Sequence, residues 1–174
     1  DIRTMKKLPI LLCVFLLSAC APSEVPLDKL VERNSIRYEI NSQIPFTGVS
    51  TVYYENGQLK EKVNWVDGKL NGLFELYHEN GQLDYKITYK DGKQNGIAEF
   101  YHENGQLKEK LIYKDNELNG LVEAYYENGQ LLDKATHKDG KLNGLLETYY
   151  ENGQEKFSPK CYQNDKEVDI SRCK

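Results

Sequence analysis

The chain has 174 residues and a formal net charge of −4, and 39% of its residues are hydrophobic. That length accommodates one domain of ordinary size. The negative balance leaves no basic patch of the kind that binds nucleic acid, so no nucleic-acid partner is expected. Tyrosine alone supplies 13 positions. Together with the modest hydrophobic content, this favours a half-exposed β structure over a thick two-layer core.

Residues 1–19 have the layout of an export signal. A short positive segment precedes the apolar run 8–17, which is too short to cross a bilayer as a stable helix. The run ends in Leu17-Ser18-Ala19-Cys20, which resembles a bacterial lipobox. The resemblance implies that Cys20 is acylated, with palmitate among its chains, and that the protein is held in the cell envelope. Ala21 rather than aspartate follows, which favours the outer membrane; the alternative is an ordinary secretory signal with a chance cysteine.

Residues 20–35 are polar and contain Pro22 and Pro26, so we expect a tether or linker between the anchor and the folded part. The segment 36–40 then alternates isoleucine and tyrosine with charged residues, as a half-exposed strand does. We expect this strand to form the N-terminal edge of the array that follows.

Glycines recur at a constant interval of 24 residues. The short segments between them are rich in aromatic and β-branched residues and are bounded by Asn-Gly or Asp-Gly, which are strong hairpin signals. A helical interpretation fails, because a turn interrupts each segment before a helix of ordinary length can form. The glycines form three series: Gly48, Gly72, Gly96, Gly120 and Gly144; Gly57, Gly81, Gly105, Gly129 and Gly153; and Gly68, Gly92 and Gly140, with Asn116 in the remaining slot.

The pattern predicts an all-β fold, an elongated antiparallel meander of five tandem 24-residue β-hairpin repeats. With the preceding edge strand, the array covers residues 36–154. Each repeat touches only its neighbours in such an arrangement, which is quasi-one-dimensional.

The length of the Glu-Asn-Gly turn decides which residues share a face. A two-residue loop at Asn80-Gly81 pairs Glu75 with Lys86, whereas a three-residue loop with a bulge pairs Tyr77 with Leu83. We prefer the three-residue loop, because it gathers the apolar residues that recur in every repeat on one face, namely Leu73, Tyr77, Leu83 and Ile87.

Five tyrosines recur in register and form the candidate binding surface: Tyr53, Tyr77, Tyr101, Tyr125 and Tyr149. The alternative is packing, because tyrosine buries its ring and keeps its hydroxyl wet. His78 and His102 share a slot that tyrosine fills in other repeats, so we interpret both as an aromatic packing position. Neither a metal ion nor a cofactor is expected.

The repeat breaks down after Gly153, and Cys161 and Cys173 follow, twelve residues apart. An exported pair at this spacing indicates a disulfide, whereas a metal site would need two further ligands that are not close in sequence. We therefore expect residues 155–174 to form a disulfide-stapled C-terminal cap that protects the last edge of the sheet.

The recurring motif is Tyr-(Tyr/His)-Glu-Asn-Gly-Gln-Leu followed by Asp-Gly-Lys-Leu-Asn-Gly-Leu. Over residues 44–154 it resembles the MORN-variant repeat, whose bacterial members are labelled YwqK-type antitoxins. The resemblance implies a β-hairpin sheet for protein or membrane contacts, with an antitoxin or immunity role as a special case.

MORN repeats also precede the catalytic domain of plant phosphatidylinositol-4-phosphate 5-kinases. No P-loop, Gly-rich loop or metal-binding Asp-Phe-Gly supports that activity here. We therefore expect a non-catalytic envelope lipoprotein that binds a partner protein, and a membrane- or wall-contacting structural module is the alternative.

Overall fold

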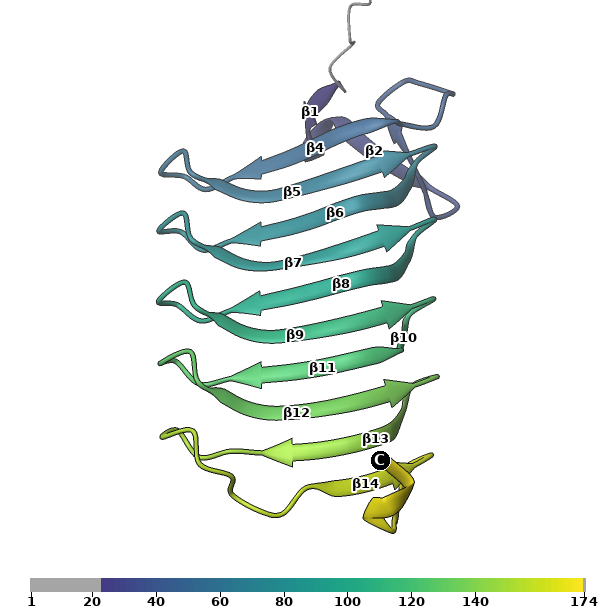
Figure 1. The fold of residues 1–174 in the computed structure, drawn as a ribbon. Coiled ribbons are helices and arrows are strands. Elements are labelled where there is room, and N and C mark those ends of the chain that lie inside the picture. The colour runs from purple at the N-terminus through teal and green to yellow at the C-terminus, as the bar shows by residue number, and fades with distance from the viewer. Residues whose placement is uncertain (1–22, 174) are drawn as a thin grey trace, which may run out of the picture.

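The computed structural model describes residues 23–173, most of which lie in one long sheet (Figure 1). The predicted signal 1–19 and Cys20 fall outside the described residues. The sheet has thirteen strands in the spatial order β1-β4-β5-β6-β7-β8-β9-β11-β12-β13-β14-β15, with β10 beside β9. The predicted all-β meander of successive hairpins is therefore confirmed.

The repeats supply the strands from β4 to β13, which are stacked in chain order with the Glu-Asn-Gly turns along one edge (Figure 1). Their bounds are β4 (Gly48–Tyr53), β5 (Leu59–Val66), β6 (Lys69–Tyr77), β7 (Leu83–Lys90), β8 (Lys93–Tyr101), β9 (Leu107–Lys114), β10 (Glu117–Leu118), β11 (Gly120–Tyr125), β12 (Leu131–Lys138) and β13 (Lys141–Thr148).

Each Glu-Asn-Gly turn is a three-residue loop closed by two backbone hydrogen bonds. In the second repeat the His78 amide donates to the Gln82 carbonyl at 2.8 Å, and the Gly81 amide donates to the His78 carbonyl at 2.9 Å. Gly81 takes a φ of 83°, which glycine adopts without steric cost. The predicted three-residue loop is confirmed, and Tyr77 lies opposite Leu83 as expected.

The predicted grouping of apolar residues on one face is wrong. A bulge between Leu76 and Tyr77 shifts the register, so that Phe74, not Leu73, lies opposite Ile87. Leu73 and Ile87 consequently point to opposite faces, and their exposed fractions are 39% and 7%. A bulge inserts one residue on one strand, and this changes the side-chain alternation beyond it.

The Asp-Gly turns at the other edge are two-residue hairpin loops. Asp91 and Gly92 have φ values of 52° and 82°, the left-handed pair that a tight type I′ turn requires. The Gly92 amide donates to the Leu70 carbonyl at 2.8 Å, one repeat earlier. Equivalent bonds run from Asn116 to Gln94 and from Gly140 to Leu118, so these turns also join successive repeats.

The N-terminal segment is folded rather than extended as a tether. It comprises β1 (Glu24–Pro26), the 3-10 turn η1 (Leu27–Lys29), β2 (Leu30–Arg33) and β3 (Ile36–Glu39). β1 pairs in parallel with β4 and occupies the edge of the main sheet. The expected edge strand at 36–40 is instead β3, which pairs with β2 in a separate two-stranded sheet.

This N-terminal cap folds because it has an apolar surface to cover. Leu30 and Phe46 are 6% and 4% exposed and form a core with Val63 and Trp65 of β5. The Trp65 indole donates to the Ser50 hydroxyl at 2.8 Å, which satisfies its one polar group in this buried position. The apolar residues of the supposed tether are therefore part of the core.

The C-terminal segment extends the sheet and folds over its last repeat. It contains β14 (Lys160–Gln163), β15 (Lys166–Val168) and the 3-10 turn η2 (Ile170–Cys173), and β14 pairs with β13. A disulfide joins Cys161 to Cys173. Cys161 is only 1% exposed and lies opposite Leu145. The last repeat is therefore covered by the chain itself, as the first one is.

Candidate binding surface

The two faces of the sheet differ sharply in chemistry. One face carries a continuous row of charged residues that alternate in sign across the strands, and we call it the charge-ladder face. In cross-strand order the row reads Lys62, Glu75, Lys86, Glu99, Lys110, Glu123, Lys134 and Glu147. Opposite charges that face each other across strands stabilise a sheet, whereas like charges would repel.

The pair at the middle of the ladder is in direct contact. Lys86 Nζ lies 2.7 Å from Glu99 Oε2, and both side chains are at most about a third exposed (35% and 17%). The hydrogen bond to Glu99 raises the pKa of Lys86. The same bond lowers the pKa of Glu99. Both groups are held in their charged forms by each other.

The five recurring tyrosines, Tyr53, Tyr77, Tyr101, Tyr125 and Tyr149, lie on the charge-ladder face, next to this row. The Tyr101 hydroxyl donates to Glu99 Oε2 at 3.0 Å. Burial, and then the glutamates two residues earlier, Glu75, Glu123 and Glu147, raise the pKa of Tyr77, Tyr125 and Tyr149. Tyr53 is 54% exposed, whereas the other four are half-buried. The structure thus places the five tyrosines on one face, beside the glutamates of the ladder.

In three of the five repeats, the residue after the recurring tyrosine ties that repeat to the next. The Tyr54 hydroxyl donates to the Tyr77 carbonyl at 2.6 Å, and Tyr126 bonds likewise to the Tyr149 carbonyl at 3.0 Å. His102 occupies this slot and its Nε2 lies 2.9 Å from the Tyr125 carbonyl, so that nitrogen carries the hydrogen. Histidine here replaces a tyrosine as a hydrogen-bond donor between repeats, in addition to packing.

Within residues 23–173, no three His, Cys, Asp or Glu side chains are grouped so that they could hold a metal ion.

The asparagines of the Glu-Asn-Gly turns form hydrogen bonds within and between repeats. Asn104 Nδ2 donates to the Glu127 carbonyl of the next repeat at 2.8 Å, and its Oδ1 accepts from the Gln106 amide at 2.9 Å. Polar residues at this edge thus add further bonds between repeats.

The opposite face, which we call the aromatic face, carries a stack of rings that the sequence analysis did not single out. Ring centroids are 5.7 Å apart between Phe74 and Tyr85 and 5.6 Å apart between Tyr85 and Phe100, and Tyr89 stands edge-on to Phe74 at 6.4 Å. All four side chains are half-buried. Offset and edge-to-face rings at these distances attract one another.

Carboxylates flank this stack. Glu61, Glu109 and Asp133 lie in one cross-strand row with Tyr85 and Phe100. Burial raises the pKa of Glu61. Burial, and then the neighbouring carboxylates, raise the pKa of Tyr85 and of Tyr113. Between β5 and β13 this row contains no lysine or arginine, so the aromatic face is acidic.

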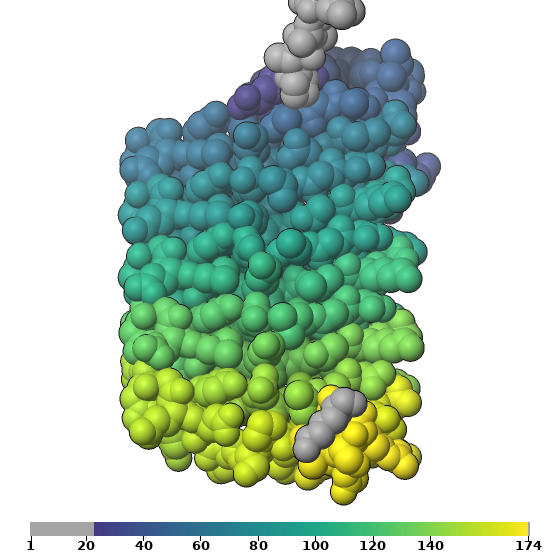
Figure 2. All heavy atoms as spheres, in the orientation of Figure 1, coloured from purple at the N-terminus to yellow at the C-terminus, as the bar shows by residue number. Residues whose placement is uncertain are grey.

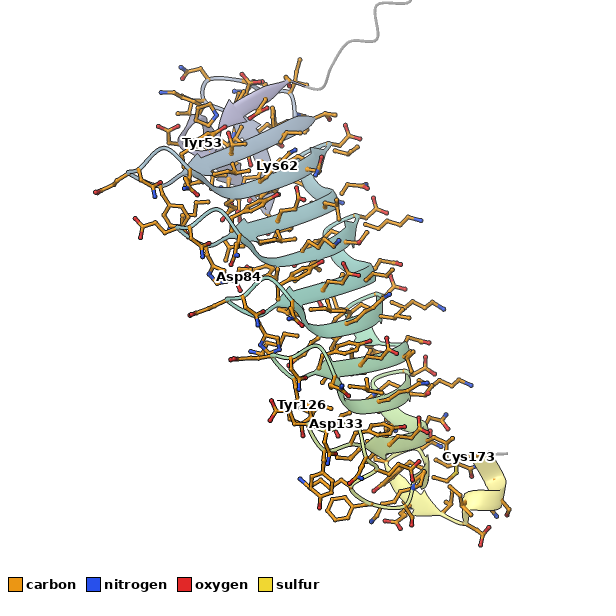
Figure 3. The ribbon with its side chains drawn as sticks, turned by 60° about the vertical axis from the view of Figure 1, so that its left-hand side comes forward. Tyr53, Lys62, Asp84, Tyr126, Asp133 and Cys173 are labelled. Carbon is orange, nitrogen blue, oxygen red and sulfur yellow. A yellow bond between two sulfur atoms is a disulfide. The ribbon has the colours of Figure 1, made fainter. Side chains whose placement is uncertain are left out.

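The chain itself covers only the first part of the aromatic face. The N-terminal cap places Leu30 and Phe46 over Val63 and Trp65, and Phe74 lies at the margin of this cluster. Figure 3 shows a single sheet with side chains on both sides, and no second layer covers the middle repeats. The aromatic face therefore continues beyond the cap without a partner from residues 23–173.

The charge-ladder face is shallow. Figure 2 shows it as continuous tiers of side chains, one repeat after another, with η2 at the end of the array. Both surfaces are therefore extended and suit another extended surface better than a small molecule enclosed in a deep site.

A comparison with family models gives a match for the MORN repeat variant over residues 46–67, 70–91, 94–115, 118–139 and 142–154, more than half of the chain. Each of the first four matched segments includes one Glu-Asn-Gly turn with residues of the strands on either side, and the fifth contains residues of β13 and ends just after its turn. No curated protein matches the chain. No helix in the described part of the chain is long and apolar enough to cross a membrane.

Proposed function

Because the chain belongs to the MORN repeat variant family, we propose that it is a non-catalytic scaffold that binds a partner protein through its aromatic face. Acylated Cys20 would hold the scaffold in the cell envelope, with the outer membrane favoured. If the partner is a toxin, the same binding makes the chain an immunity protein.

The observation that carries this proposal is the continuation of the aromatic face beyond the N-terminal cap. Over the first repeat the chain covers this face with Leu30 and Phe46, which are almost completely buried there. Over the following repeats Phe74, Tyr85 and Phe100 continue the same surface without such a cover. The cap therefore indicates what kind of contact the face accepts: apolar side chains, which here come from β2 (Leu30) and from the loop before β4 (Phe46).

The charge of the face specifies the partner further. Glu61 and Glu109 border the rings, and Asp133 follows two strands beyond Glu109; no cation of the same row neutralises them. A partner segment that combines apolar residues with arginine or lysine would bury the rings and also meet the carboxylates. Arginine and lysine also stack favourably on tyrosine and phenylalanine rings.

The charge-ladder face is the weaker candidate, although the five recurring tyrosines lie there. At its middle, Lys86, Glu99 and Tyr101 already bind one another. A partner would have to break these contacts before making its own. Partner binding by the two faces can therefore be compared directly within one molecule.

The test is photo-crosslinking in intact envelopes. A benzoylphenylalanine in place of Tyr113 reports on the aromatic face, and one in place of Tyr101 reports on the charge-ladder face. We expect a specific protein adduct only from position 113, identified by mass spectrometry. Glu109→Lys should abolish it, whereas Lys108→Glu, the reversal at the neighbouring exposed residue, should leave it intact. Adducts from position 101 alone, or adducts that survive Glu109→Lys, would contradict the proposal.

A further inference from the structure

We infer that the N-terminal end of the array rests directly on a lipid bilayer and that the repeats project away from it. This inference rests on the proposed acylation of Cys20 and adds the surface that meets the lipid and the orientation of the sheet. It follows from the short distance between the anchor and the first strand, and from the apolar side chains at that end.

The chain between the proposed anchor and the first strand is short. Ser23 is already fixed to the sheet, because its carbonyl accepts the Val49 amide at 2.8 Å and its hydroxyl donates to the Thr47 carbonyl at 3.2 Å. Three residue steps separate Ser23 from Cys20. Fully extended, they span at most about 11 Å. An acylated Cys20 would therefore hold this end of the array within reach of the lipid headgroups.

Large apolar side chains are exposed close to Ser23. Ile44 is 77% exposed, more than any other large hydrophobic residue in the described part of the chain, and it lies three residues before Thr47. Ile40 is 47% exposed. Their loop and β1 lie at the same end of the molecule, above β4 (Figure 1).

The edge of β4 offers a third apolar element. Pro26, Leu27, Val52 and Tyr53 line a shallow hollow there, where β4 continues past the end of β1. Side chains such as Tyr53, with an apolar ring and a polar tip, suit the boundary between acyl chains and headgroups. The apolar contacts on both sides of Ser23 would meet the same membrane plane.

The charges at this end select the kind of lipid. Glu24, Asp28 and Glu39 are exposed around the apolar residues, with Lys29 as the one neighbouring exposed cation in η1. Such a surface is repelled by anionic headgroups. The lipid that fits is zwitterionic, and the contact should depend on apolar burial rather than on salt.

The consequence is a defined orientation. The strands from β4 to β13 stack along the axis that leads away from this end, at about 4.8 Å per strand. The last repeat would then stand roughly 40 Å from the lipid, by the same spacing. Both faces of the middle repeats would remain open to a protein that approaches along the membrane.

The experiment uses the full acylated chain reconstituted in phosphatidylcholine vesicles with brominated acyl chains. Ile44→Trp places a fluorophore at the proposed contact, and Phe157→Trp places one at the distant end, where Phe157 is 62% exposed. Trp65 is 9% exposed and gives both variants the same protected background. We expect bromolipid to quench at least half of the added emission of Ile44→Trp and none of that of Phe157→Trp.

The outcomes separate the inference from the proposed anchoring. Mass analysis before reconstitution shows whether Cys20 carries acyl chains, and an unmodified cysteine overturns the anchoring and the inference together. With acyl chains present, an unquenched Ile44→Trp overturns the inference alone, and so does equal quenching at both positions. Replacing a third of the phosphatidylcholine with phosphatidylglycerol should reduce the quenching of Ile44→Trp; an increase would likewise overturn it.

Discussion

Glu75 and Lys86 face each other across β6 and β7, and this pairing places both side chains on the charge-ladder face. Lys86 also faces Glu99 on its other side, at 2.7 Å. Each lysine of the ladder between β5 and β12 thus stands between residues of neighbouring strands. In the middle of the array, both of its neighbours are glutamates.

Lys86→Glu should destabilise the array, because it places three carboxylates in a row. Each cross-strand pair contributes roughly 0.2–1 kcal/mol, so the loss of two attractions and the gain of two repulsions should cost about 1–2 kcal/mol after solvent screening. Urea unfolding measures this change. Lys93→Glu is the matched control: Lys93 is the first residue of β8, its side chain is 57% exposed and lies 4.0 Å from Asp115, and its reversal should cost under about 0.5 kcal/mol. Equal effects of both reversals would refute the stabilising role of the ladder.

The Lys86–Glu99 pair predicts how the stability of the array depends on pH. The pKa of Glu99 is lowered by its bond to Lys86, so its contribution is present above the ordinary glutamate pKa of 4.5 and is lost as the pH falls through the folded value. The pKa of Lys86 is raised, so its contribution is present below 10.5 and is lost as the pH rises through its folded value. Glu99→Gln should flatten the acid limb of a melting-temperature profile. An unchanged acid limb would show that other carboxylates control it.

Ionisation of Glu61 affects the stability of the fold in the opposite direction to ionisation of Glu99. The pKa of Glu61 is raised by burial, so its ionisation opposes folding once the pH exceeds the ordinary value of 4.5. Glu61→Gln should therefore raise the melting temperature at pH 7 and leave it nearly unchanged at pH 3, where glutamate is already protonated in both states. Calorimetry at the two pH values measures the difference. A variant that is less stable at pH 7 would mean that Lys60 and Arg37 hold the ionised carboxylate more strongly than burial penalises it.

Much of this arrangement was predictable from the spacing of residues, and the errors have identifiable causes. The strands, the turns and the three-residue Glu-Asn-Gly loop follow from the glycine spacing, because glycine occupies the turn positions of positive φ. The predicted grouping of apolar residues on one face is wrong because it assumes regular strand pairing on both sides of the loop. The structure has a further register shift between Leu76 and Tyr77. The bulge at Tyr77 restores the Glu75–Lys86 pair that a two-residue loop would give. The alternation of glutamate and lysine at one position of successive strands was the signal for the correct register.

The N-terminal cap was harder to predict for a different reason. Val25, Leu27 and Leu30 are separated by charged residues and prolines, which locally resemble a linker. Their burial depends on Trp65, far along the chain, and no local pattern encodes that contact. The aromatic face was missed for the same reason as the register, since Phe74, Tyr85 and Phe100 come together only after the bulge.

Gly120→Ala should destabilise the array more than Gly92→Ala. Gly120 has a φ of 141°, and an added Cβ would lie 2.9 Å from the Ile112 Cβ on the neighbouring strand. Gly92 also has a positive φ, but nothing lies within 4 Å of its Cβ position. Both substitutions carry a backbone cost of about 1 kcal/mol or more at positive φ, and at Gly120 the contact with Ile112 adds to it. Equal losses of unfolding free energy in urea would show that β9 moves away from the added methyl group without an energetic cost.

Leu30→Ala should loosen the N-terminal cap without disturbing the far repeats. Leu30 is 6% exposed in the one cluster of buried apolar side chains that the described residues form, and its truncation should cost about 2–4 kcal/mol locally. In a linear array each repeat depends on its neighbours alone, so the loss should not spread. Hydrogen exchange should speed up in β2, β3 and β5 and remain unchanged in β12 and β13. Faster exchange along the whole sheet would instead mean that the cap nucleates a single cooperative unit, and the array would then unfold as one domain rather than repeat by repeat.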